Sequence, residues 1–179
     1  MTSSTTVMIV NWNSGTLLQE CLNKLSEQTV MPQRVLVVDN ASSDDSAACV
    51  ARFPGATLLQ MITNLGFAAG NNRALTECDT EFVVLLNPDA FPEPDWLENL
   101  LAAAGAHPDV TAFGSRQLRQ GSPEVLDGVG DSYHMSGLVW RERQTMDHPE
   151  WDQHRLFKLF IRVGIERLTV LVGLLGLLT

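Results

Sequence analysis

Two polar side chains suited to metal binding, Asn87 and Asp89, directly follow the unbroken apolar run 82–86. Five successive apolar residues predict a strand that is buried on both faces, as in the interior of a parallel sheet. Pro88 ends that strand because it has no N–H to donate. A carboxylate two residues from an amide could bind a hard divalent cation that carries phosphates. The alternative is a turn in which Asn87 and Asp89 only cap the next helix.

Two earlier apolar runs also end in polar side chains. Run 7–10 is followed by Asn11 and Asn13, and run 35–38 by Asp39 and Asn40. Parallel α/β sheets bind ligands at the carboxyl ends of their strands, so adjacent strands would bring these groups within reach of one ligand. The glycine- and amide-rich segment 64–73 suits close approach of the backbone to a ligand, although a tight loop would need the same residues.

The elements that must position these residues follow a regular order. Apolar runs predict strands at 7–10, 35–38, 57–62, 82–86 and 110–114, and helical spacing predicts helices over 17–25, 47–53 and 96–104. Four successive strand, loop and helix units imply parallel pairing through right-handed crossovers. The sequence therefore predicts an α/β fold with a doubly wound, mostly parallel sheet.

Charge and cysteine content narrow the function classes. The 179 residues carry a net charge of −9, and residues 1–140 alone hold 6 basic and 16 acidic side chains. A body this acidic repels a polyphosphate backbone, so we expect no nucleic-acid partner. Cys21, Cys49 and Cys78 are widely spaced and odd in number, which indicates reduced thiols. No basic-then-apolar leader precedes Val7, so the expected location is cytoplasmic.

The last 39 residues differ in character from the rest. We expect a binding domain over 1–140, a charged linker over 141–155 and an apolar, amphipathic helical tail over 156–179, in which Lys158, Arg162 and Glu166 form a polar stripe. The uninterrupted apolar part, 168–179, has 12 residues against about 20 needed to span a bilayer. The tail is interpreted as an interfacial helix at the inner face of the plasma membrane, or as a helix packed on a partner protein.

Several nucleotide-binding classes lack their motifs here. The first strand end, Asn11-Trp12-Asn13-Ser14-Gly15, is not the Gly-x-Gly-x-x-Gly of a dehydrogenase, and no P-loop is present. The Gly-rich basic loop of a sugar-nucleotide pyrophosphorylase is also missing. The kind of nucleotide site that is left after these exclusions is one in which side chains and a metal hold the nucleotide.

Four motifs in order resemble those of family 2 inverting glycosyltransferases, especially the rhamnosyltransferase-like branch. They are Val10-Asn11-Trp12-Asn13-Ser14-Gly15, Val37-Val38-Asp39-Asn40-Ala41-Ser42-Ser43-Asp44, Asn64-Leu65-Gly66-Phe67-Ala68-Ala69-Gly70-Asn71-Asn72 and Leu86-Asn87-Pro88-Asp89-Ala90. The resemblance runs from about Val7 to about Arg141. It implies a Rossmann-like, A-type nucleotide-sugar-binding fold, here with a C-terminal hydrophobic helix.

The resemblance also implies roles for individual residues. Asp39 would bind the nucleotide base, Asn11 would sit beside the nucleotide, and Asp89 would be the last acid of the Asp-x-Asp metal motif, for Mg²⁺ or Mn²⁺. Asn87 replaces the first acid of that motif. The full set expected to bind the nucleotide sugar is Asn11, Asn13, Asp39, Asn40, Asn64, Gly70, Asn71, Arg73 and Asn87.

The implied reaction is a metal-assisted inverting displacement in cell-wall or polysaccharide biosynthesis. A sugar would move from a nucleoside-diphosphate donor, with dTDP-rhamnose as a candidate, to a glycan or lipid-linked acceptor. The catalytic base is not identified, because the family's downstream acidic motif has no counterpart after Trp140. The alternative is a truncated, catalytically impaired homologue that only binds nucleotide sugar.

Overall fold

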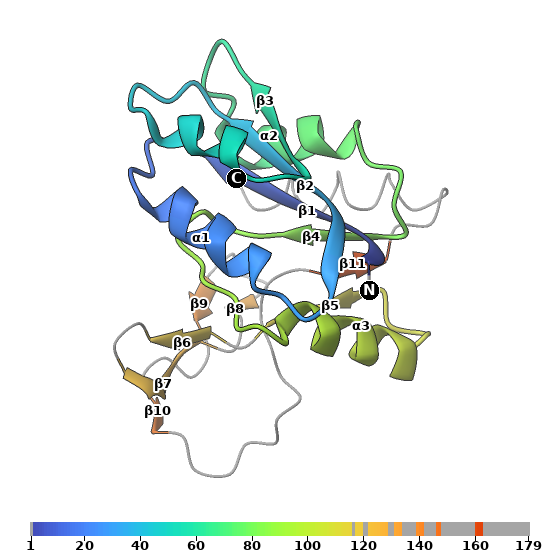
Figure 1. Cartoon of the computed structure of the whole chain (residues 1–179). Helices are drawn as coiled ribbons and strands as arrows, with labels where there is room; N and C mark the ends of the chain where they lie inside the picture. The colour runs from blue at the N-terminus through green and yellow to red at the C-terminus, as the bar shows by residue number, and fades with distance from the viewer. Residues whose placement is uncertain are drawn as a thin grey trace.

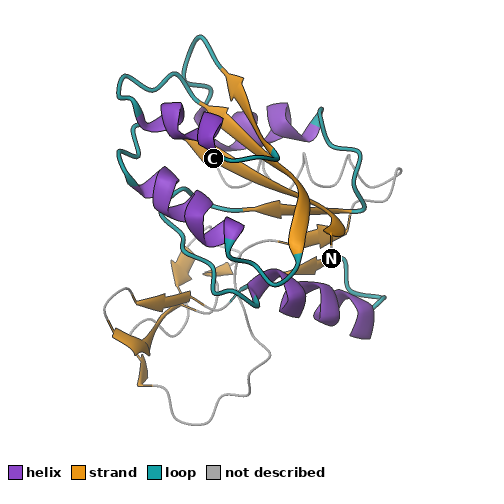
Figure 2. Ribbon diagram, viewed as in Figure 1, coloured by secondary structure: helices purple, strands orange, loops and turns teal. Residues whose placement is uncertain are grey.

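A six-stranded sheet with helices on both faces forms the centre of the protein (Figures 1 and 2). The computed structural model describes residues 2–115 and, beyond them, only the strand segments 117–119, 122–128, 131–133, 139–141, 146–147 and 160–162. The sheet order is β3-β2-β1-β4-β11-β5. Strands β1 (Thr2–Asn11), β2 (Met31–Asp39), β3 (Ala56–Gln60) and β4 (Phe82–Leu85) are mutually parallel.

The alternation of apolar side chains along β1 explains why both faces are covered. Val7 and Ile9 point into a core built with α1 (Leu17–Ser26), the 3-10 helix η1 (Ser46–Arg52) and α3 (Trp96–Ala106). Met8 and Val10 point to the other face, where α2 (Gly66–Leu75) covers them. The prediction of a doubly wound, mostly parallel sheet is therefore confirmed.

The described elements differ from the predicted ones at four places. Helix α2 covers most of the glycine- and amide-rich segment 64–73, for which no helix bounds were predicted. Residues 46–52 form a 3-10 helix, not an α-helix. The fifth predicted strand is only Ala112–Phe113 (β5), and it joins the sheet through β11. The expected helix over 156–179 is wrong at Phe160–Arg162 (β11), which pairs antiparallel with β4 and β5. This pairing satisfies the hydrogen-bonding edge of β4, which a helix could not do. The rest of 156–179 lies outside the described residues.

The remaining described strands form two small antiparallel sheets. One contains β6 (Gln117–Arg119), β7 (Ser122–Gly128) and β10 (Met146–Asp147), and the other β8 (Asp131–Tyr133) and β9 (Val139–Arg141). All three cysteines are free thiols, as predicted. Within the described part of the chain, no helix has the length and apolar character needed to cross a membrane.

Candidate functional site

Asn11 lies at the centre of a hydrogen-bond network where β1 and β2 end side by side. Asn11 pairs with Asp39 in the sheet, and the two side chains are 0% and 3% exposed. The Asn11 Nδ2 atom donates to Asp39 Oδ1 at 3.0 Å, to Ser46 Oγ at 2.9 Å and to Ser42 Oγ at 3.2 Å. Its Oδ1 accepts a hydrogen bond from the Ser14 hydroxyl. Both ends of this amide are engaged by the protein, so Asn11 positions its neighbours.

Asp39 is held in one orientation by this network. Its Oδ1 accepts from Asn11 Nδ2 and from Ser42 Oγ, the latter at 2.5 Å. Its carbonyl oxygen accepts from Met61 N at 2.9 Å. Both side-chain hydrogen bonds found for Asp39 among the described residues reach Oδ1, which leaves Oδ2 to accept from a ligand.

Asn40 connects the end of β2 to the start of α2. Its backbone N–H donates to Asn11 O at 2.8 Å, and its Nδ2 donates to Asn64 Oδ1 at 2.8 Å and to Gly66 O at 3.3 Å. Asn40 Oδ1 accepts from Leu65 N at 2.8 Å. Asn64 Oδ1 also accepts from Gly66 N at 2.8 Å. The structure thus joins Asn11, Asp39, Asn40 and Asn64 in one continuous network.

Asn13 fastens the loop after β1 to the loop after β2. It adopts a left-handed conformation with φ 50°, and its Oδ1 accepts from Ser43 N at 2.7 Å and from Asp44 N at 3.3 Å. Asp44 Oδ2 in turn accepts from Gly15 N at 2.9 Å. The Ser46 hydroxyl, followed by the Gly15 and Ser46 backbone N–H groups, holds the pKa of the Asp44 carboxyl below its usual value of 3.8. This carboxylate therefore stays ionised at neutral pH.

The serines of these two loops are residues that the sequence did not single out. Ser42 and Ser46 contact the Asn11 amide, and Ser14 donates to it from the opposite side. The sequence signal was the polar run after Asp39, in which the individual serines were given no role. Alternating hydroxyls and carboxylates after a buried strand end are equally suited to orienting the strand-end acid.

The α2 residues expected at the site lie in different places. Gly70 packs on β1, where a Cβ atom would lie 3.0 Å from Val10 Cγ1. Asn71 is 1% exposed; its Nδ2 donates to Phe67 O at 3.0 Å, and its Oδ1 has no hydrogen-bond partner among the described residues.

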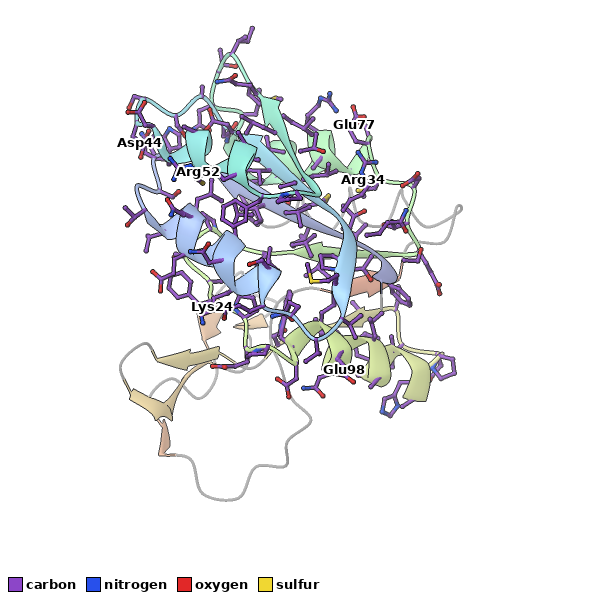
Figure 3. The ribbon with its side chains drawn as sticks, viewed as in Figure 1. Lys24, Arg34, Asp44, Arg52, Glu77 and Glu98 are labelled. Carbon is purple, nitrogen blue, oxygen red and sulfur yellow. The ribbon has the colours of Figure 1, made fainter. Side chains whose placement is uncertain are left out.

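Arg73 is an expected site residue that points away from the network. Its guanidinium bonds to Glu77 Oε1 at 2.8 Å, and the Glu77 carbonyl accepts from Arg34, near the start of β2. Figure 3 shows Arg34 and Glu77 on the side of the domain opposite Asp44. Seven residues of helix separate Arg73 from Gly66, which amounts to roughly 10 Å along the axis.

Asn87 and Asp89 are exposed at the same edge of the sheet as the network. Leu86 N donates to Met8 O at 2.9 Å, which keeps β4 beside β1 up to this point, and Ala90 N donates to Asn87 O at 3.1 Å to close a turn. Asn87 and Asp89 do not cap the next helix, because α3 begins after Asp95 and its Leu97 N–H bonds to Gln28 Oε1. The helix-cap interpretation of this pair is therefore wrong.

The donor atoms on this turn suit a metal shared with phosphates. In the described residues no three His, Cys, Asp or Glu side chains gather into a metal cage. Mg²⁺ and Mn²⁺ sites that act on phosphates commonly use one or two carboxylates, with phosphate oxygens and water as the other ligands. One carboxylate, Asp89, and one amide oxygen, Asn87, fit that arrangement.

A cleft of about 340 Å³ lies beside the Asn13 and Asp44 loops, between α1 and η1. Its lining includes Gln19 from α1 and Arg52 from η1, together with Asp44. Asn87 and Asp89 do not line it. The cleft is therefore separate from the turn that would hold a metal.

Comparisons with known proteins identify the family of the chain. The chain matches the model of glycosyl transferase family 2 over residues 6–165. It is 32% identical over 170 residues to an N-acetylglucosaminyl-diphospho-decaprenol L-rhamnosyltransferase of Mycobacterium tuberculosis, an alignment that covers 86% of this chain and 53% of the relative. It is 26% identical over 140 residues to an O-antigen chain rhamnosyltransferase of Salmonella typhimurium, covering 75% of this chain and 44% of the relative.

Solved structures share the fold. The mannosyltransferase PcManGT of Pyrobaculum calidifontis, in complex with GDP-Man and Mn²⁺, superposes with a TM-score of 0.60 and 29% identity, over 68% of this chain and 37% of that one. TarS of S. aureus, in complex with UDP-GlcNAc, gives a TM-score of 0.58 and 25% identity, over 63% of this chain and 34% of that one. The expected A-type fold is confirmed.

The present chain spans about half the length of the curated relatives it matches. The family model nevertheless covers most of it, from the first strand to beyond β11. The chain belongs to glycosyl transferase family 2 and has rhamnosyltransferases among its relatives.

Proposed function

We propose that this protein binds a nucleoside-diphosphate sugar at the edge formed by the ends of β1, β2 and β4, and transfers the sugar to a hydroxyl of a glycan or lipid-linked acceptor. One observation carries the proposal: the buried Asn11 and Asp39 network ends at the same sheet edge as the exposed Asn87 and Asp89 turn. The related structures that hold GDP-Man with Mn²⁺ and UDP-GlcNAc support this class of donor.

Each part of the edge has a distinct role in the proposed reaction. Asp39 Oδ2 accepts a hydrogen bond from the nucleotide base, while Asn11 and Ser42 hold Oδ1 and so fix the carboxylate. Asn40 and Asn64 hold the first turn of α2 beside the nucleotide. Asp89, with Asn87, holds the divalent metal, which when bound neutralises charge on the departing diphosphate. The exposed side of the turn leaves room for the diphosphate.

Inverting transfer also needs a base that takes the proton of the acceptor hydroxyl. The family's downstream acidic motif has no counterpart between Trp140 and Thr179. This observation is the ground for a second candidate function, a homologue that binds the donor without transferring the sugar. Donor binding is common to both candidates, so only turnover separates them.

Turnover is tested with purified protein, Mg²⁺ or Mn²⁺, and a panel of nucleotide sugars that includes dTDP-rhamnose. The transferase proposal expects release of the nucleoside diphosphate, either by transfer to a lipid-linked or glycan acceptor or by slow hydrolysis. Binding by calorimetry without any release would establish the binding-only homologue instead. Absence of both binding and release would refute the proposed function.

The Asp89→Ala variant tests the metal role directly. Calorimetry with a nucleoside diphosphate should show that added Mn²⁺ strengthens binding to the parent protein and has little effect in the variant, because Asp89 is the carboxylate of the turn. Asp95→Ala is the matched control, since it removes an exposed acid a few residues further along and should keep the Mn²⁺ effect. An unchanged Mn²⁺ effect in Asp89→Ala would exclude this residue as a ligand.

The tail is proposed to attach the protein peripherally to a membrane. The last 39 residues carry 6 basic and 5 acidic side chains and so do not repel an anionic surface. Residues 1–140, with 6 basic and 16 acidic side chains, do repel it. A chain ending at residue 165 should partition less onto anionic liposomes than the full chain, because it lacks the apolar segment 168–179 but retains β11. Equal partitioning of the two chains in a flotation assay would refute membrane attachment through this segment.

A further inference from the structure

The side chain of Gln28 joins two segments that are far apart in the sequence. Gln28 lies two residues after the end of α1 and is 6% exposed. Its Nε2 donates to Glu93 O at 2.7 Å and to Lys24 O at 3.2 Å, and its Oε1 accepts from Leu97 N at 3.1 Å. Both ends of the amide are therefore bonded to backbone groups, two of which belong to the segment that follows Asn87 and Asp89.

Gln28 also completes the start of α3. The first N–H groups of a helix have no partner within the helix, and a side chain at the N-cap usually accepts from one of them. Asp95 occupies the N-cap of α3 without making such a bond. Gln28 Oε1 accepts from Leu97 N instead. Gln28, which follows α1, therefore helps to fix the position at which the segment after β4 becomes helix α3.

Two further contacts link the same pair of segments. Thr29 N donates to Pro94 O at 2.8 Å, next to the Gln28 contacts. The Cys21 thiol lies 3.7 Å from Asn87 O, at the other end of the segment. Cys21 lies within α1, and Gln28 and Thr29 lie just beyond its end. The segment 87–97 is thus held at both ends by the stretch 21–29.

The turn depends on this backbone support. The Asn87 and Asp89 side chains are exposed and make no hydrogen bond of their own within the described part of the chain. Their position is therefore set by the backbone on either side of them. On the β4 side the sheet supplies that support, through Leu86 N and Met8 O. On the α3 side, Gln28 supplies two of the hydrogen bonds.

We propose that Gln28 is a positioning residue for the turn that carries Asn87 and Asp89, so that its amide sets the affinity for the divalent metal and the diphosphate bound there. This inference rests on the proposed donor site. Groups that hydrogen-bond directly to metal ligands typically contribute about 10- to 100-fold to metal affinity. Gln28 acts through the backbone at Glu93 and Leu97, so we expect its contribution at the lower end of that range.

The test compares Gln28→Leu, Gln28→Glu and Thr80→Val with the full-length parent chain. Leucine keeps the approximate bulk of Gln28 and removes all three hydrogen bonds. Glutamate keeps an acceptor for Leu97 N but loses the donor to Glu93 O. Thr80→Val is the matched control, because Thr80 is 6% exposed and bonds to Thr6 Oγ1 at 2.8 Å at the opposite end of β4. This change removes the hydrogen bonds of Thr80 Oγ1 with Thr6 Oγ1 and with the Phe82 carbonyl, without touching the turn.

The measurements are the Kd of Mn²⁺ in the presence of a nucleoside diphosphate, the Kd of the nucleoside diphosphate without metal, and hydrogen exchange at the Leu97 amide. We expect Gln28→Leu to weaken Mn²⁺ binding by about tenfold or more and to speed exchange at Leu97. Gln28→Glu should weaken Mn²⁺ binding while keeping Leu97 more protected than in the leucine variant. Metal-free nucleotide binding should stay within about twofold in both, because the Asp39 network is intact.

Three other results have defined meanings. Mn²⁺ affinity unchanged in both Gln28 variants, while Asp89→Ala loses it, would overturn the role of Gln28 and leave the proposed donor site standing. Equal weakening in Thr80→Val would also overturn it, because general destabilisation would then explain the effect. A parent chain that binds no nucleoside diphosphate with or without Mn²⁺ would overturn the donor site and this inference with it. If Gln28→Leu does not fold, Gln28→Glu and the control still decide the outcome.

Discussion

Asn11 and Asp39 show at the residue scale how a buried amide can control an acid. Asn11 Nδ2 lies 3.0 Å from Asp39 Oδ1, and neither side chain is appreciably exposed. An amide stabilises the ionised form of a neighbouring carboxylate by donating to it, whereas a second carboxylate in the same place would repel it. The identity of residue 11 therefore decides whether Asp39 meets a hydrogen-bond donor or a second acid at this buried strand end.

Replacing Asn11 by aspartate should make stability depend on pH. Two carboxylates in this buried site cannot both ionise easily, so the pKa of the pair rises above that of ordinary acids. Because the raised pKa belongs to the folded state, Asn11→Asp should lose roughly 2 kcal/mol or more of its free energy of unfolding near pH 7 and recover part of it as pH falls through that raised pKa. Urea unfolding at several pH values measures the effect.

Asn13→Asp is the control for this change. Asn13 Oδ1 only accepts hydrogen bonds from the 43–44 loop, and the residue is exposed, so a carboxylate can replace it with little change. If the difference in free energy of unfolding between Asn11→Asp and the parent does not change with pH over the acidic range, the proposed coupling between residue 11 and Asp39 is contradicted.

At the element scale, the contact between α2 and β1 is closer than ordinary helix packing on a sheet. A Cβ atom at Gly70 would lie 3.0 Å from Val10 Cγ1 and 3.1 Å from Val10 Cγ2. Both methyl groups of Val10 therefore lie in the space that a side chain at residue 70 would need. Because Gly70 has no side chain, α2 can lie directly against β1, the strand that leads to Asn11.

Gly70→Ala should therefore destabilise the protein by about 1 kcal/mol, since overpacking outweighs the better helix propensity of alanine. The same substitution at Gly105, in α3, should stabilise it by about 0.5 kcal/mol, because nothing lies within 4 Å of the added Cβ. Thermal or urea unfolding compares the two variants. Adding Val10→Ala to Gly70→Ala should remove much of the steric clash. If Gly70→Ala and Gly105→Ala shift the free energy of unfolding in the same direction, overpacking at Gly70 is contradicted.

The positions of the strands near the site were largely predictable from the sequence. The roles of individual residues within the site were less predictable. Unbroken apolar runs predicted three of the four parallel strands, β1, β2 and β4, because a doubly covered sheet needs apolar residues on both faces. The run that predicted β3 is interrupted by Gln60, and no residue of β3 is fully buried. Asn11 was expected beside the nucleotide, but the sequence cannot show that both ends of its amide are used internally. Arg73 was expected at the site because the glycine- and amide-rich segment looked like one loop, whereas most of it is helix. The pairing of β11 is non-local, so helical spacing over 158–166 was misleading there.

At the scale of the whole molecule, β11 connects the end of the chain to the middle of the sheet. It pairs with Phe82, Val83 and Val84 of β4 on one side and with β5 on the other. All four β4 residues are buried. Without β11, an apolar strand would become an open sheet edge, which favours edge-to-edge association.

Two shortened chains test this role. A chain ending at residue 155 lacks β11 and should show a lower urea midpoint and more aggregation than the full chain. A chain ending at residue 165 keeps β11 and should unfold close to the full chain. Sedimentation and urea unfolding measure the two effects. Equal behaviour of both shortened chains would mean that β11 contributes little to the sheet.

The late position of β11 also has a consequence for synthesis on the ribosome. About 75 residues separate the end of β4 from Phe160, the first residue of the strand that covers its edge. At ~5–20 residues per second, β4 waits roughly 4–15 s for its partner. During that interval the nascent chain presents an apolar strand edge to its surroundings, a ready binding surface for chaperones that recognise extended segments. Translation speed over residues 86–160 therefore sets how long this chain is exposed to misassembly with its neighbours on a polysome.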